Sequence, residues 1–126
     1  MTEEAIRKVL ASYGQTCDDG RFEEFAALFA TDAVFHALPG EPVQGREAIR
    51  SFMEAAYTPE VRGKHLLGEP LITLDDGAAT ATTDFAFMGR LPEGGWGVSV
   101  VGRYHDELAR GDDGVWRFTR HTIAML

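Results

Sequence analysis

Four side chains of the sequence could do acid–base chemistry together: Tyr13, Asp18, His65 and Asp84. An imidazole exchanges protons near neutral pH, a carboxylate can orient it, and a phenol hydroxyl can donate a hydrogen bond to a carbonyl. Each residue also has a purely structural interpretation: Tyr13 as a core aromatic, Asp18 as a solvated helix end, and His65 and Asp84 as polar strand residues. The elements that position these residues decide between the two interpretations.

His65 and Asp84 belong to two segments that predict a β-hairpin around the turn signal at Asp76–Gly77. Counting outward from a two-residue turn places His65 and Asp84 on the same face of the sheet. Asp84 then lies opposite Glu69, about 13 Å along the strand from His65. Pro70 cannot donate to a ladder, so it predicts either an irregularity that could bring the two side chains together or an edge of the sheet.

Tyr13 and Asp18 fall on a helix predicted between Thr2, its N-cap, and Gly20, its stop signal. Apolar side chains recur at the spacing of one helix face: Ile6, Val9, Leu10, Tyr13 and Cys17. Asp18 follows Tyr13 by little more than one turn, so the two lie near the same side of the helix. Asp19 is better placed to cap the next helix.

Four further residues are candidates for binding a substrate: Phe52, Met53, Trp116 and Arg120. Phe52 and Met53 lie on the apolar side of a predicted third helix. In the segment "VWRFTRH", strand alternation puts Trp116 and Arg120 on one face and His121 on the other. Arg120 could clamp a carbonyl or an anion, or it could stack on the aromatic rings and reach water, as arginines more often do.

The order of the elements is helices first and hairpins second. A period of 3.6 predicts helices within residues 2–20, 21–30 and 45–57, with a short strand at 32–38. Two antiparallel hairpins follow residue 59. This order predicts the α+β class, with the helices packed on one face of a curved sheet. A cavity between the two layers is then the natural place for a small-molecule ligand.

Length, charge and composition limit the possible partners, location and cofactors of the chain. The 126 residues predict one domain, residues 1–126, and a net charge of −8 argues against nucleic acid or an anionic membrane as partner. One cysteine and an N-terminus without a signal-peptide core predict a cytoplasmic location. The sequence has no nucleotide-binding glycine loop and no metal-binding His or Cys motif, so we expect no cofactor and no metal.

Longer stretches resemble a known family. "YGQTCDDGRFEEFAALFATDAVFH", "GREAIRSFM", "KHLLGEPLITLDDGAATA", "GRYHDEL" and "GVWRFTRH" follow in the order seen in SnoaL-like members of the nuclear transport factor two-like superfamily. The resemblance covers nearly the whole chain. It implies a cone-shaped α+β barrel, with three N-terminal helices in a curved, mostly antiparallel sheet around a deep pocket, and commonly a homodimer.

Within that superfamily the match to the ketosteroid isomerases is partial. Tyr13 matches their first-helix tyrosine. Their general-base aspartate falls at or next to Ala37, with His36 beside it, so the isomerase base is missing from its usual place.

The resemblance to scytalone dehydratase and the bile-acid 7α-dehydratases is better. These enzymes combine a tyrosine and an aspartate of the first helix with a strand histidine and a partner from the next strand. The corresponding places here hold Tyr13, Asp18, His65 and Asp84, and Arg120 corresponds loosely to the C-terminal arginine of the bile-acid enzymes.

These residues together predict a cofactor-independent lyase or isomerase that removes a proton next to a carbonyl of a hydrophobic molecule, such as a steroid or polyketide. His65 would be the base, Asp84 would fix its tautomer, and Tyr13 would donate to the enolate oxygen. Asp18 would position Tyr13 or a leaving hydroxyl. The alternatives are a non-catalytic binding or interaction domain, and an epoxide hydrolase or polyketide cyclase built on Asp84 and Arg120.

Overall fold

The computed structural model describes residues 2–126 and contains three helices, α1 (Thr2–Asp18), α2 (Phe22–Ala26) and α3 (Arg46–Ala56). The predicted stripe of α1 is buried at Ile6, Leu10, Tyr13 and Cys17. The second helix is shorter than predicted because the chain from Phe29 onward joins the sheet.

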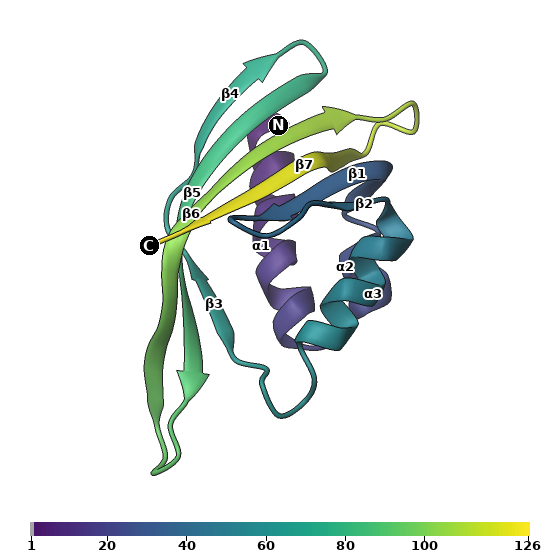
Figure 1. Ribbon diagram of the computed structural model, residues 1–126. Coiled ribbons are helices and arrows are strands. Elements are labelled where there is room, and N and C mark those ends of the chain that lie inside the picture. The colour runs from purple at the N-terminus through teal and green to yellow at the C-terminus, as the bar shows by residue number, and fades with distance from the viewer. Residues whose placement is uncertain (1) are drawn as a thin grey trace.

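Seven strands form one sheet: β1 (Phe29–Ala37), β2 (Val43–Gln44), β3 (Lys64–Leu67), β4 (Leu71–Asp75), β5 (Ala78–Arg90), β6 (Trp96–Arg110) and β7 (Trp116–Met125). The strand order is β2-β1-β7-β6-β5-β3, and β4 also pairs with β5. Only β1 and β7 pair in parallel within the described residues. The sheet curves around the helices without closing, and the helices lie on its concave side (Figure 1). The predicted α+β class is confirmed.

The edge of β5 carries two strands whose registers differ by one residue. β4 follows the predicted hairpin, with Leu71 opposite Thr82. Leu67 of β3 lies opposite Phe85. The chain therefore covers four residues between Leu71 and Leu67, whereas β5 covers only three between Thr82 and Phe85. This shift reverses the face of every β3 side chain. His65 therefore lies opposite Phe87, and the predicted face shared with Asp84 is wrong.

A similar irregularity lies in β7. Leu108 of β6 pairs with Phe118, but the preceding residue, Glu107, pairs with Arg120, so β7 has one extra residue. Such a bulge changes which side chains point inward. As a result His121 is buried on the same side as Phe118, contrary to the predicted alternation.

The core lies between the helical stripes and the concave face of the sheet. Most of its fully buried side chains are aromatic or aliphatic, and they include Phe25, Phe29, Phe118, Ile6 and Ile49. Among residues 2–126, no helix combines the length and the apolarity needed to cross a membrane.

Cys17 of α1 lies in this core, and its thiol is expected to react only when the chain unfolds. The residue is 0% exposed, and burial raises its pKa to about 12. At pH 8 roughly one thiol in 10⁴ is then the reactive thiolate. We expect an aromatic disulfide reagent to label the urea-unfolded chain within minutes and to leave the native chain unlabelled. Rapid labelling of the native chain would contradict this packing.

Candidate functional site

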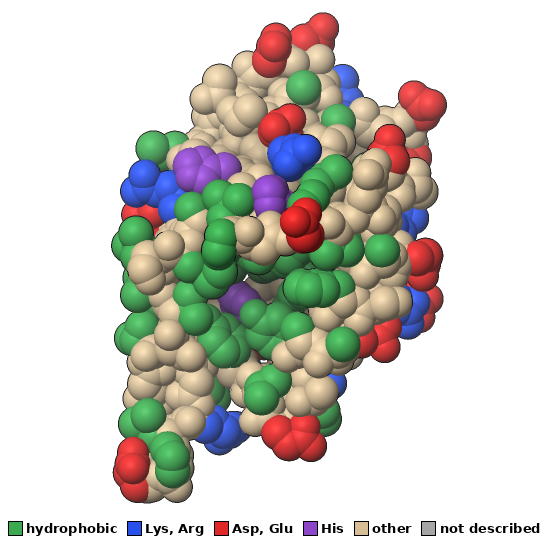
Figure 2. Space-filling view, in the orientation of Figure 1, with side chains coloured by type: hydrophobic (Ala, Val, Ile, Leu, Met, Phe, Trp, Pro, Cys, Tyr) green, Lys and Arg blue, Asp and Glu red, His purple; other side chains and the backbone are tan. Residues whose placement is uncertain are grey.

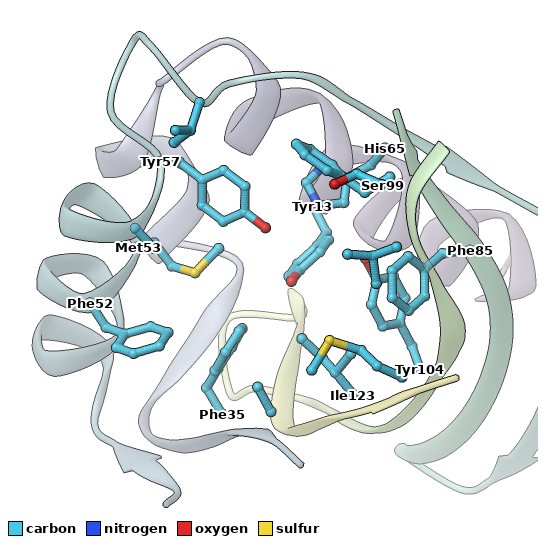
Figure 3. Close-up of a pocket in the computed structure, with 16 residues that line it drawn as sticks. Tyr13, Phe35, Phe52, Met53, Tyr57, His65, Phe85, Ser99, Tyr104 and Ile123 are labelled. Atoms are coloured by element: carbon cyan, nitrogen blue, oxygen red, sulfur yellow. The ribbon is translucent and has the colours of Figure 1, made fainter. Parts of the chain in front are cut away.

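A cavity of about 350 Å³ lies between the helices and the concave face of the sheet. Its walls are mainly apolar and include Phe35, Phe52, Met53, Phe85 and Phe87 (Figure 3). Phe52 and Met53 of α3, two of the candidates for binding a substrate, line the cavity. In Figure 2 an opening appears among hydrophobic side chains with a histidine inside it, and His65 is the one histidine that lines the cavity.

Five polar side chains reach this cavity: Tyr13, Tyr57, His65, Ser99 and Tyr104. They include all three tyrosines of the chain. The lining contains no lysine, arginine, aspartate or glutamate. A ligand held here would meet hydroxyl groups, one imidazole and aromatic faces, which suits an uncharged ring compound with one or two polar substituents.

His65 is held by Asp18 across the gap between β3 and α1. The ring Nδ1 lies 2.6 Å from Asp18 Oδ1, and the main-chain N–H of His65 donates to Asp18 Oδ2 at 2.9 Å. Both side chains are at most 5% exposed. Because a carboxylate only accepts hydrogen bonds, Nδ1 carries a proton here, and the lone pair of the neutral ring is on Nε2. Nε2 is therefore the nitrogen available to a ligand.

The approach of α1 to β3 depends on Gly14. A β-carbon at this position would lie 3.1 Å from His65 Cβ, closer than an ordinary van der Waals contact. Asp18 is the last residue of α1, where the helix dipole disfavours negative charge. The two hydrogen bonds from His65 offset that cost. A helical glycine between Tyr13 and Asp18 was the sequence signal for this close contact.

The hydroxyl groups of the cavity are donors at neutral pH. Burial raises the pKa of Tyr57 to about 12 and raises the pKa of Tyr13 well above its ordinary value. Burial also raises the pKa of Tyr104, an effect that a hydrogen bond with Tyr13 partly offsets. Tyr13 and Tyr57 both lie close to His65, with ring centroids 5.9 Å and 5.8 Å from the imidazole.

Asp84 lies on the outer face of the sheet, away from His65. Arg103 Nε donates to Asp84 Oδ1 at 2.6 Å, and both side chains are more than half exposed. The hydrogen bond from Arg103 lowers the pKa of Asp84. Asp84 does not line the cavity. The irregularity near Pro70 exists, but it separates the two side chains that it was expected to join.

Trp116 and Arg120 are also absent from the cavity lining. Trp116 is buried below the guanidinium of Arg110, whose Cζ lies 5.8 Å from the ring centroid. Arg120 pairs with Glu107, an exposed position of β6. The bulge in β7 explains why Arg120 does not share a face with Trp116, although strand alternation had predicted that it would.

A second buried histidine–aspartate pair was missed in the sequence. His121 Nδ1 and Asp106 Oδ1 are hydrogen-bonded, and both side chains are at most 1% exposed. The His121 ring lies behind Tyr13, with ring centroids 4.5 Å apart. Counting along a regular hairpin places Asp106 opposite Arg120. The bulge in β7 shifts the register by one residue, so that Asp106 lies opposite His121 instead. A residue count alone could not have found the pair.

Sequence comparison agrees with this architecture. The family model described as a SnoaL-like domain matches residues 1–122. No curated protein sequence matches the chain significantly.

Several solved structures share the fold over nearly the whole chain. A variant of Rv3472 from Mycobacterium tuberculosis, of unknown function, has a TM-score of 0.91 at 26% identity, covering 99% of this chain and 72% of that one. An NTF2-like protein with a cystatin-like fold from Novosphingobium aromaticivorans has a TM-score of 0.89 at 26% identity, with 98% and 81% covered. A protein of the same organism, provisionally described as a scytalone dehydratase, has a TM-score of 0.86 at 26% identity, with 99% and 84% covered.

Proposed function

The chain belongs to the SnoaL-like domain family, and from that premise we propose that it is a cofactor-independent lyase or isomerase acting on an uncharged ring ketone. The observation that carries the proposal is the buried Asp18–His65 pair, which leaves His65 Nε2 for an aromatic cavity. A base oriented by a carboxylate beside a set of hydroxyl donors is the arrangement that proton abstraction next to a carbonyl requires.

In the first step His65 Nε2 takes a proton from the carbon next to the carbonyl. The hydrogen bond from Nδ1–H to Asp18 fixes the orientation of the ring, so the ring does not have to rotate during the transfer. The carboxylate of Asp18 also stabilises the imidazolium that forms. Asp18 thereby takes the role that the sequence suggested for Asp84.

Negative charge develops on the carbonyl oxygen as the proton leaves. Tyr13 and Tyr57 both have rings beside that of His65, and their raised pKa values keep them protonated. Hydrogen bonds from fixed donors are strongest in a site from which water is excluded. These two hydroxyls are therefore proposed to hold the enolate oxygen.

The fate of the abstracted proton separates the lyase from the isomerase. In a lyase the imidazolium gives the proton to a hydroxyl on the β-carbon, which leaves as water. In an isomerase acting on a β,γ-unsaturated ketone the intermediate is a dienolate, and the imidazolium returns the proton to its γ-carbon. The structural similarity to the protein provisionally described as a scytalone dehydratase supports the lyase.

Deuterium exchange tests the shared step without a leaving group. We expect the wild-type chain to exchange the α-protons of 1-tetralone in D₂O, and His65→Gln to lower the rate by about 10²-fold or more, because general base catalysis typically contributes that much. Mass spectrometry of the recovered ketone gives the rate. Conversion of 3-hydroxy-1-tetralone to 1-naphthol and water would identify the lyase branch. No exchange by the wild-type chain would favour the non-catalytic binding domain instead.

The remaining alternative, an epoxide hydrolase or cyclase built on Asp84 and Arg120, required these residues to converge in the cavity. Neither lines it. The homodimer and the cytoplasmic location stay predictions.

A further inference from the structure

The wall of the cavity formed by β5 and β6 contains a third irregularity. Phe87 pairs with Val100, but the next residue of β5, Met88, pairs with Val98. One step along β5 therefore matches two steps along β6, and Ser99 is the extra residue. Bulges of this kind redirect side chains and are frequent beside active sites.

The bulge directs the hydroxyl of Ser99 into the cavity. In a regular strand Ser99 and Val100 would point to opposite faces, yet both line the cavity. Ser99 is exposed, so its side chain is not packed into the core. It is the one aliphatic hydroxyl among lining residues that are otherwise aromatic or apolar. An exposed hydroxyl on the cavity wall is accessible to a ligand.

Ser99 and His65 stand on two sides of the same aromatic residue. Phe87 of β5 pairs with His65 of β3 and with Val100 of β6. The strands that carry His65 and Ser99 are thus two ladder spacings apart, roughly 9–10 Å. Figure 3 shows both side chains at the sheet side of the cavity, with Tyr57 entering from the opposite side. A fused ring lying on Phe87 could present one oxygen near His65 and another near Ser99.

We propose that Ser99 is a specificity-determining residue that binds a second hydroxyl of the substrate, so that the site selects hydroxylated fused-ring ketones over unsubstituted ones. The proposal rests on the proposed use of the cavity, and it adds a substrate class. Ser99 takes no part in proton abstraction.

Equilibrium binding tests this independently of turnover. The probes are 1-naphthol, which resembles the enol of a bicyclic ketone, and the 1,5-, 1,6- and 1,7-dihydroxynaphthalenes, measured by ligand fluorescence. We expect at least one diol to bind the wild-type chain about three- to tenfold more tightly than 1-naphthol, the factor of one neutral hydrogen bond. Ser99→Ala is expected to abolish that preference and to change the affinity for 1-naphthol less than twofold.

Two variants serve as controls. Ser99→Thr keeps a hydroxyl and should keep the preference for the diol, and Ser51→Ala removes an exposed serine of α3 that does not line the cavity. The inference is overturned if no diol binds more tightly than 1-naphthol, or if Ser99→Ala retains the preference. Absence of deuterium exchange by the wild-type chain would overturn the proposed reaction alone, because the binding preference is measured without it.

Discussion

Replacing Asp18 with asparagine is expected to slow α-proton exchange by about 10²–10⁴-fold, the range that a correctly protonated general base contributes. Asp18 accepts two hydrogen bonds, one from the main-chain N–H of His65 and one from Nδ1. An asparagine has a single acceptor oxygen. If that oxygen stays with the main-chain N–H, the amide NH₂ faces Nδ1 and the ring proton moves to Nε2. The nitrogen facing the cavity then has no lone pair with which to take a proton.

Asp84→Asn is the matched control, because it removes the same charge from the exposed pair with Arg103. We expect this variant to exchange α-protons within twofold of the wild-type rate. Thermal unfolding followed by circular dichroism should show that both variants are folded at the assay temperature. An Asp84→Asn variant as impaired as Asp18→Asn would refute the assignment of Asp18 as the partner of His65.

The sequence predicted the general architecture well, because each element carries its own local signal. The stripe of α1 has helical spacing, and Asp76–Gly77 specifies a turn that fixes the register of β4 against β5. Tyr13 and Asp18, which are close in sequence, lie on one helix as predicted, and both contact His65.

The faces of residues far from a turn could not be predicted by counting. One extra residue in a strand reverses all later faces. The shift beside β3 is closed by a hydrogen bond from the Gly68 N–H to the Asp84 carbonyl at 2.8 Å, a contact that depends on the packed sheet rather than on local sequence. Irregularities of this kind turn His65, Ser99 and His121 inward. The chemistry of the site therefore depends on these breaks in strand alternation.

Replacing His121 with phenylalanine is expected to lower the free energy of unfolding by about 3–5 kcal/mol, the cost of leaving one partner of a buried pair alone. Phenylalanine keeps the ring that packs on Tyr13 but removes the partner of Asp106, which is buried. The carboxylate would then stay buried without its hydrogen bond. Urea unfolding of the variant and the wild-type chain gives the difference directly.

Removing both members of the pair separates its electrostatic cost from its packing. The double variant His121→Phe/Asp106→Leu leaves no buried charge, and we expect its stability to return to within about 1 kcal/mol of wild type or to exceed it, as for other buried pairs replaced by apolar residues. Arg103→Ala is the control, because it breaks the ion pair with Asp84, which is exposed to water. We expect it to lower the free energy of unfolding by about 1 kcal/mol or less. If the single and double variants lose the same free energy of unfolding, this explanation is wrong. The loss would then come from altered packing around His121, and other groups would compensate the charge of Asp106.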